Sequence, residues 1–370
     1  MKIAYFIGSL DRGGLESLTL DICKQYGKTP YDFICVYRHE GNMSEDFKSS
    51  GAPLIQVSKK RGYIRYLLAL RKTFKEKHVA IVHSQTPSNT LLLSIALFGS
   101  GIKIITTFHG HLFAKAPWWQ RKIVYSASER IICVSNYQKQ YYEQNWKLPK
   151  ENKLHVVYNG IDFSKIEKAT AKVDARASAG IRLVSIGNFI KGRSQIVICK
   201  AIQRLKDQNI FGFDFFFVGR RDEREPWRYD ECVHYCEEHH LDNAHFLGSR
   251  EDVPELLKSM DGFVYSTAHD TFGIAALEAI SAGLPIVVND WLVMTEVCDL
   301  GLLPDINRAI RFFRTDDVAD CADKMKELLV DIKTNNKQLH ADCQLAAVAA
   351  KQKYSIEKHI ENLHAAYEGI

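Results

Sequence analysis

The sequence predicts an α/β fold with two doubly wound domains, and three observations carry this prediction. A chain of 370 residues is long enough for two domains of ordinary size. Its apolar fraction of 46% supplies side chains for two hydrophobic cores. In both halves, short apolar runs alternate with helical patterns, and this alternation is typical of a parallel sheet covered by helices.

The strands of the first half are predicted from continuous apolar runs, which suit strands that are buried on both faces. The runs are residues 3–7, 33–37, 80–82, 104–107 and 131–134. Between them, apolar residues at helical spacing predict helices over 15–26, 64–77 and 90–98. Ligands of such a sheet bind beyond the carboxyl ends of its strands.

The second half repeats this alternation. Its predicted strands are 183–186, 215–218, 246–247, 263–265, 286–288 and 310–313, and a last helix with one apolar face is predicted over 355–368. Between the halves, Asn159-Gly160 is a strong turn signal, and residues 169–180 are poor in large apolar side chains. The predicted domains are therefore 1–168 and 178–354.

Charge is divided unevenly between the two halves. Residues 1–165 contain 24 Lys and Arg against 12 Asp and Glu, a net +12, and the rest of the chain has a net −7. A basic first half beside an acidic second half predicts different partners for each. The first eight residues are a short apolar run with one Lys and no small-residue cleavage site, so they predict a strand and not a signal peptide. The longest apolar run, 91–99, is too short to span a bilayer.

Nine scattered cysteines without a Cys-x-x-Cys pair indicate a reducing, cytoplasmic location. Cys232, Cys236 and His240 recur every four residues on an expected helix, so they could share a face and bind a metal. Three residues on one helix lack a fourth ligand, and buried cysteine is common. We therefore expect neither a metal nor any other cofactor.

Residues 265–289 are the most informative stretch, and they predict a strand, a loop, a helix over 274–281, a turn and a second strand. The hydroxyl of Thr271 is expected to cap the helix. Free N–H groups at the helix start form a site for a phosphate, and Gly273 lets the backbone approach such a ligand. Glu278 can accept hydrogen bonds from sugar hydroxyls, and Asp270 can reach another polar group. The pattern suggests a nucleotide-sugar pocket, and an ordinary strand-to-helix turn is the alternative.

This stretch resembles the signature of glycosyltransferase family 4, the retaining GT-B enzymes. The family has two acidic residues separated by seven, with Phe-Gly shortly after the first, and here the pair is Asp270 and Glu278. Glu is usual at the first position, so Asp270 is one methylene shorter. The resemblance implies two Rossmann-like domains facing each other across a cleft, with a terminal helix over 355–370 crossing back to the first domain.

Other landmarks resemble the same family. Gly13 and Gly14 open a Gly-Gly-x-Glu motif before a helix, although a tight turn is the ordinary interpretation. His109 ends a predicted strand, where the family has a histidine near the transferred sugar, and His111 is a weaker candidate. The segments 134–136 and 157–162 also match family landmarks.

The loop after the strand at 183–186 is expected to bind the donor diphosphate. Asn188 occupies the place of the family's arginine, which is a departure from the pattern. Arg193 occupies the place of the family's lysine, and Lys191 is an extra candidate. A guanidinium can bind a diphosphate bidentately. A solvated loop is the alternative for both cations.

The resemblance implies a role for each site residue. Glu278 would bind the ribose hydroxyls, and Asp270 and His109 would hold the donor sugar. The remaining donor-binding candidates, for the diphosphate and the loops around it, are Gly13, Gly14, Asn188, Lys191, Arg193, Thr271, Phe272, Gly273 and Ile274. The implied reaction retains the anomeric configuration, with the leaving phosphate taking the acceptor proton. The rival hypotheses are a nucleotide-sugar epimerase and a non-catalytic nucleotide-sugar-binding protein.

Two basic segments of the first half suggest contact with an anionic membrane surface. Residues 59–77 surround an apolar stripe with Lys and Arg, which also suits a helix that covers a sheet. Trp118 and Trp119 lie among cations and could meet lipid headgroups, stack on an acceptor sugar or belong to the core. We expect a UDP-sugar donor, a saccharide or lipid-linked acceptor of cell-surface polysaccharide synthesis, a location on the inner face of the cell membrane, and no nucleic-acid partner.

Overall fold

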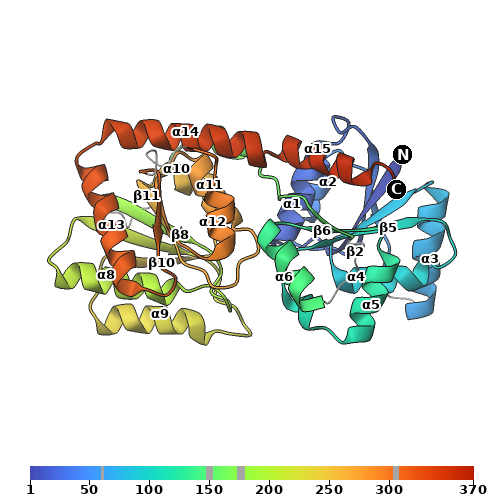
Figure 1. Cartoon of the computed structure of the whole chain (residues 1–370), viewed down its shortest axis with the longest axis horizontal. Coiled ribbons are helices and arrows are strands. Elements are labelled where there is room, and N and C mark those ends of the chain that lie inside the picture. The colour runs from blue at the N-terminus through green and yellow to red at the C-terminus, as the bar shows by residue number, and fades with distance from the viewer. Residues whose placement is uncertain (60–61, 147–152, 173–179, 303–307) are drawn as a thin grey trace. The chain divides into compact units, whose positions relative to one another are not determined.

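The structure is a computed structural model, shown in Figure 1, and it describes residues 1–59, 62–146, 153–172, 180–302 and 308–370. Its Cα positions divide the chain into two compact units. The first unit comprises Met1–Ile161 and Ile356–Ile370, and the second comprises Asp162–Ser355. The segment 173–179 of the expected linker lies outside the described residues.

The first unit is built on a seven-stranded sheet in the order β3-β2-β1-β4-β5-β6-β7, and all its neighbouring strands are parallel. The strands are β1 (Lys2–Ser9), β2 (Asp32–His39), β3 (Leu54–Gln56), β4 (Ile81–Ser84), β5 (Lys103–Phe108), β6 (Arg130–Cys133) and β7 (Leu154–Val156). The helices are α1 (Gly14–Lys24), α2 (Ser44–Ser49), α3 (Tyr63–Glu76), α4 (Pro87–Ala96), α5 (Trp118–Ala127), α6 (Asn136–Trp146) and α15 (Ile356–Tyr367), with a 3-10 turn at Leu112–Lys115.

Helices cover both faces of this sheet because alternate residues of its strands point to opposite sides. On β1, Ile3 and Tyr5 belong to a core shared with α1 and α15, whereas Ala4 and Phe6 belong to a core shared with α3 and α4. In Figure 1, α1, α2 and α15 accordingly lie on one side of the strands, and α3, α4 and α5 lie on the other. Burial on both faces explains why the apolar runs are continuous.

The second unit has a six-stranded parallel sheet in the order β10-β9-β8-β11-β12-β13. The strands are β8 (Ile181–Ile186), β9 (Phe213–Val218), β10 (Ala244–Gly248), β11 (Gly262–Tyr265), β12 (Ile286–Asn289) and β13 (Ile310–Phe313). The helices are α7 (Phe163–Glu167), α8 (Gln195–Asp207), α9 (Trp227–Glu238), α10 (Val253–Lys258), α11 (Ile274–Ser281), α12 (Leu292–Cys298), α13 (Val318–Lys333) and α14 (Lys337–Tyr354).

The predicted fold class is confirmed, since each unit is a parallel sheet with helices in Rossmann-like order. Every predicted strand and helix is present. Some elements were not predicted: β3 and β7, whose three residues carry too little apolar pattern to be recognised, and several helices, among them α5, α6, α8, α13 and α14.

The apolar face of α15 belongs to the first unit. Ile360, Leu363 and Tyr367 join the core beside β1. The Tyr367 hydroxyl lies 2.7 Å from His83 Nδ1 and donates to the Tyr5 hydroxyl at 3.0 Å. A buried polar group must find such partners, so this network fixes where α15 docks.

Helix α3 covers the sheet through buried Tyr66, Leu70 and Phe74, and a contact of residues 59–77 with a membrane stays a prediction. Trp118 and Trp119 are exposed, so assigning them to the core is wrong. Cys232 and Cys236 pack in the core of the second unit, and the described residues contain no cluster suited to a metal ion. None of the described helices combines the length and the apolar character needed to cross a membrane.

Candidate functional site

The candidate residues of the second unit gather at the carboxyl edge of its sheet, where β8 and β11 lie side by side. From β8 the chain moves outward to β9 and β10, and it then returns to the other side of β8 as β11. The strand order therefore reverses between β8 and β11, and ligands of doubly wound sheets bind at such a switch point. The loop 187–194 follows β8, and the loop 266–273 follows β11.

An ion pair between Arg193 and Asp270 joins these two loops. The hydroxyl of Tyr265 donates to Oδ2 of Asp270 at 2.7 Å, and the backbone N–H of Thr271 donates to its Oδ1 at 3.1 Å. The Arg193 guanidinium also lies over the Tyr265 ring, 5.0 Å from its centroid. Both oxygens of the Asp270 carboxylate therefore have protein partners, and one of these partners is the predicted diphosphate cation.

Both members of this pair stay charged at neutral pH. Burial acts to raise the pKa of Asp270, but the Arg193 guanidinium and the Tyr265 hydrogen bond outweigh it and hold the pKa below its ordinary value. Burial acts to lower the pKa of Arg193, but Tyr265 and Asp270 outweigh this effect and hold the pKa above its ordinary value. The loops thus present a fixed cation whose position is set by the carboxylate.

The start of α11 departs from the expected capping. The residue at the N-cap is Gly273, in the left-handed region with φ of 83°. Thr271 therefore does not occupy the N-cap position, because the helix begins at Ile274 and the residue before it adopts a conformation that favours glycine. A Cβ on Gly273 would also lie 2.2 Å from the Cε of Met294.

Other donor-binding candidates lie near this helix start. The Phe272 side chain is buried against the ring of Tyr354, so only the backbone of Phe272 is available to a ligand. Glu278 is half-buried on α11, one turn beyond Ile274. The first N–H groups of the helix and the Glu278 carboxylate thus come from one short segment.

Asn188 connects loops of the second unit rather than presenting a charge. Its Oδ1 accepts the backbone N–H of Arg220 at 3.0 Å, and its carbonyl accepts from Gln195 Nε2 at 3.3 Å. The neighbouring Gly219 approaches so closely that a Cβ there would lie 2.0 Å from the carbonyl oxygen of Gly187. Lys191 is exposed, and its backbone N–H donates to Glu225 Oε2 at 2.6 Å.

Gly192 and Asn289, which are not among the predicted site residues, support the loop after β11. The Gly192 carbonyl accepts from the Thr267 hydroxyl and the Ala268 N–H, both at 2.8 Å. The Asn289 side chain accepts from the Thr267 N–H at 2.9 Å and donates to the Thr267 carbonyl at 2.7 Å. Asn289 ends β12, so a polar residue at a carboxyl strand end was the available signal.

The candidate residues of the first unit lie at the corresponding place in its own sheet. Gly13 is the N-cap of α1, which begins at Gly14 and follows β1. His109 follows β5, and its Nε2 lies 3.1 Å from Oε1 of Gln85, which follows β4. In the order β2-β1-β4-β5, the direction of winding reverses between β1 and β4, so these residues also lie at a switch point.

The two histidines of this segment have different surroundings. Burial, together with nearby His359, lowers the pKa of His109 to about 4, so the ring is neutral at pH 7. A neutral imidazole can donate one hydrogen bond and accept another. His111 packs between the rings of Tyr137 and Tyr141, with centroids at 5.3 and 4.5 Å. His109 therefore remains the stronger candidate.

Comparisons with known proteins agree with this arrangement. The model for Glycosyltransferase Family 4 matches residues 12–165, and that for Glycosyl transferases group 1 matches residues 180–331. Together they cover most of the chain. The chain belongs to glycosyltransferase family 4.

This glycosyltransferase has relatives of similar length. It is 25% identical over 318 residues to the UDP-Gal:alpha-D-GlcNAc-diphosphoundecaprenol alpha-1,3-galactosyltransferase of Escherichia coli, covering 74% of this chain and 80% of the relative. It is 22% identical over 326 residues to the putative glycosyltransferase EpsF of Bacillus subtilis (strain 168), covering 81% and 82%. The solved structure of Anabaena Alr3699/HepE in complex with UDP and glucose matches the whole of both chains with a TM-score of 0.80 at 15% identity, which supports the GT-B fold.

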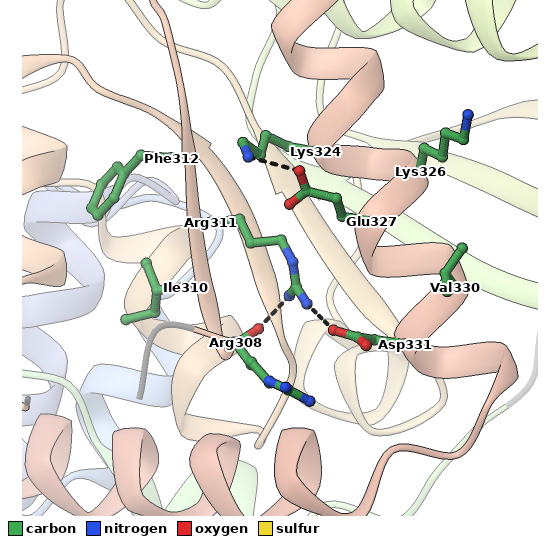
Figure 2. Close-up of a pocket in the computed structure, with 9 residues that line it drawn as sticks. All are labelled: Arg308, Ile310, Arg311, Phe312, Lys324, Lys326, Glu327, Val330 and Asp331. Atoms are coloured by element: carbon green, nitrogen blue, oxygen red, sulfur yellow. Dashed lines mark hydrogen bonds and ion pairs between the residues drawn. The ribbon is translucent and has the colours of Figure 1, made fainter. Parts of the chain in front are cut away.

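The glycosyltransferase also has a cavity of about 780 Å³ away from the switch point of its second sheet. Figure 2 shows its lining from β13 and α13, with Arg311 held between the Arg308 carbonyl and the Asp331 carboxylate. The Arg311 guanidinium is thus occupied by protein groups. This cavity lies at an edge strand and contains none of the predicted site residues.

Proposed function

We propose that this glycosyltransferase moves a sugar from a UDP-linked donor to a lipid-linked saccharide, with retention of the anomeric configuration. The product would serve the synthesis of cell-surface polysaccharide. In this proposal the second unit binds the nucleotide sugar and the first unit binds the acceptor. Asp270 and His109 hold the donor sugar in position.

The observation that carries the proposal is the Arg193–Asp270 pair beside the start of α11. A diphosphate needs positive charge and N–H donors, and the fixed guanidinium and the first amides of α11 supply both from neighbouring loops. Glu278 follows one turn later on the same helix, and its carboxylate would accept hydrogen bonds from the ribose hydroxyls. Lys191 is exposed on the same loop as Arg193 and adds a second cation.

The proposed chemistry needs little beyond positioning and charge. The acceptor hydroxyl oxygen forms a bond to the anomeric carbon while the bond from that carbon to the phosphate oxygen breaks. The diphosphate leaves with the electron pair and takes the acceptor proton on the same face of the sugar. Arg193 and the α11 amides stabilise the charge that develops on the diphosphate, and preorganised groups of this kind can supply much of the rate.

The acceptor class is supported by the relatives. The Escherichia coli galactosyltransferase is named for a UDP-Gal donor and a diphosphoundecaprenol-linked acceptor. A lipid-linked acceptor would bring the enzyme to the inner face of the cell membrane. The basic first half of the chain suits such an anionic surface.

The experiment is a panel of nucleotide sugars tested first for thermal stabilisation, since a ligand that binds only the folded state raises its stability. The stabilising donor is then incubated with and without polyprenyl-diphosphate saccharides, and released UDP is measured. We expect UDP release that depends on the acceptor, and an NMR spectrum of the product with retained configuration. Donor binding without acceptor-dependent release would overturn the proposal, as would epimerisation of the donor alone.

Glu278→Ala tests the nucleotide site directly. We expect UDP affinity in calorimetry to fall by about tenfold or more, the loss typical of a charge-assisted hydrogen bond. Glu237→Ala is the matched control, because Glu237 is an exposed glutamate on α9 of the same unit. Equal UDP affinities for Glu278→Ala and Glu237→Ala would remove Glu278 from the site.

A further inference from the structure

Three neighbouring helices of the first unit, with the turn that follows α4, carry more than half of the large apolar side chains that are exposed in the described residues. Eight of the fifteen large apolar side chains that are exposed in the described residues lie between residues 63 and 123. They are Tyr63, Ile64, Leu68, Ile95, Phe98, Trp118, Trp119 and Ile123. Helix α4 packs against both α3 and α5, so the three helices form one layer over the sheet. We call the outer side of this layer the α3–α5 face, and a concentration of this kind is typical of an interaction surface.

The most exposed aromatic side chains gather where α4 ends beside α5. Phe98 is 83% exposed, Trp118 is 68% exposed and Trp119 is 49% exposed. They border a hollow of about 730 Å³ that is also lined by Lys103 and Lys122. On the opposite side of α4, Arg71 of α3 donates to the Phe98 carbonyl at 2.6 Å and fixes the segment that presents this ring.

The same helices carry an excess of positive charge. Residues 62–129 contain nine Lys and Arg but only two acidic residues. Both acidic residues already pair with lysines, Glu76 with Lys72 at 3.7 Å and Glu129 with Lys103 at 2.9 Å. The unneutralised cations repel a second copy of this face, whereas they attract an anionic surface.

We infer that the α3–α5 face docks the glycosyltransferase on a bilayer that contains anionic phospholipid. Trp118, Trp119 and Phe98 enter the headgroup region, where amphipathic aromatic rings are favoured. Lys115 and Lys122, which flank the two tryptophans in the sequence, lie at the level of the lipid phosphates. The inference deepens the proposed function and rests on it in one respect, because a lipid-linked acceptor places the substrate at the same surface.

Vesicle co-sedimentation of the full chain tests this surface. We expect strong binding to vesicles of phosphatidylcholine mixed with phosphatidylglycerol and weak binding to phosphatidylcholine alone. Trp118→Ala with Trp119→Ala should lower the partition coefficient by about tenfold or more, since two large side chains no longer enter the lipid. Trp227→Ala is the control, because Trp227 is 53% exposed on the second unit.

Lysine variants provide a second test that does not depend on the tryptophans. Lys115→Gln and Lys122→Gln should each weaken binding about fivefold, and only on vesicles with phosphatidylglycerol. The matched control changes two exposed lysines of the second unit, Lys333→Gln and Lys337→Gln. Circular dichroism and thermal unfolding verify that all variants are folded.

Three results would overturn the inference. The first is unchanged vesicle binding in the double tryptophan variant. The second is a loss of vesicle binding in the Trp227→Ala control that equals the loss in the double variant. The third is a wild-type chain that does not bind vesicles but forms a dimer, and a double variant in which this dimer dissociates. A chain that docks on vesicles but neither binds nor consumes a nucleotide sugar would refute the proposed function and leave the docking surface standing. Acceptor-dependent UDP release without vesicle binding would refute the docking surface alone.

Discussion

Asp270 is one methylene shorter than the glutamate that glycosyltransferase family 4 usually has at the first acidic position. In this chain its carboxylate is held by Arg193, Tyr265 and the Thr271 amide. The short side chain therefore has a partner for each oxygen before any ligand arrives. We propose that Asp270 contributes by positioning Arg193 as well as by contacting the donor sugar.

Asp270→Asn tests this role at the level of one residue. Asparagine keeps the size of the side chain but removes the charge that fixes the guanidinium, so we expect kcat/KM for UDP release to fall about a hundredfold. Asp214→Asn is the control, because Asp214 is buried near the start of β9 and lies 2.9 Å from His245. A loss of kcat/KM in Asp214→Asn as large as that in Asp270→Asn would indicate general destabilisation and contradict the specific role.

At the scale of elements, the site depends on how closely two loops approach. Gly192 has φ of 92°, and a Cβ at this position would lie 2.6 Å from the Cβ of His269. We expect Gly192→Ala to separate the loop after β8 from the loop after β11, to lower the free energy of unfolding by about 2–5 kcal/mol and to abolish most UDP release. Urea unfolding and the UDP assay measure the two effects.

Gly212→Ala separates backbone strain from loop contact. Gly212 has a similar φ of 89°, but nothing lies within 4 Å of a Cβ built there. Its substitution should cost only the strain of a left-handed alanine, about 1–3 kcal/mol, and leave activity intact. If Gly192→Ala and Gly212→Ala lose the same stability and the same activity, the close approach of Gly192 to His269 does not contribute to function.

Helix α15 depends on a buried hydroxyl. Tyr367→Phe leaves His83 Nδ1 and the Tyr5 hydroxyl without this partner inside the first unit, so we expect a loss of about 1–3 kcal/mol and faster hydrogen exchange over residues 356–370. Tyr26→Phe is the control, because it removes an exposed hydroxyl that donates to Asp32 at 3.4 Å. Equal protection of α15 in wild type and Tyr367→Phe would show that apolar contacts alone hold the helix.

Most of the described strands and the signature residues could be predicted from the sequence, because burial on both faces leaves continuous apolar runs and the acidic pair has a fixed spacing. The hydrogen-bond and packing partners of these residues could not be predicted. The hydrogen bonds of Asn289 and the approach of Gly192 to His269 join positions far apart in the chain. Likewise, a threonine before a helix predicts an N-cap residue, but the N-cap position of α11 belongs to the left-handed Gly273.

At the scale of the whole molecule, acid should weaken the first unit because three of its histidines are held neutral. Burial lowers the pKa of His83 from 6.5 to about 3, and those of His109 and His359 to about 4. In the unfolded chain these rings take up protons near pH 6.5, whereas in the folded unit they do not. Stability is therefore fully present above about pH 6.5 and falls as the pH decreases toward about 4.

The expected slope is about 1 kcal/mol per pH unit for each fully buried ring, His83 and His359, and it is measured by urea unfolding with hydrogen exchange of the first unit. His359→Asn should reduce this slope, since an amide can still donate to the Tyr158 carbonyl, which lies 2.6 Å from His359 Nδ1, but cannot titrate. His234→Asn is the control, because that side chain is 80% exposed on α9 of the second unit. A first unit whose stability is constant from about pH 7 to pH 5, or a His359→Asn slope equal to that of wild type, would show that the buried rings are not the groups that couple folding to protons.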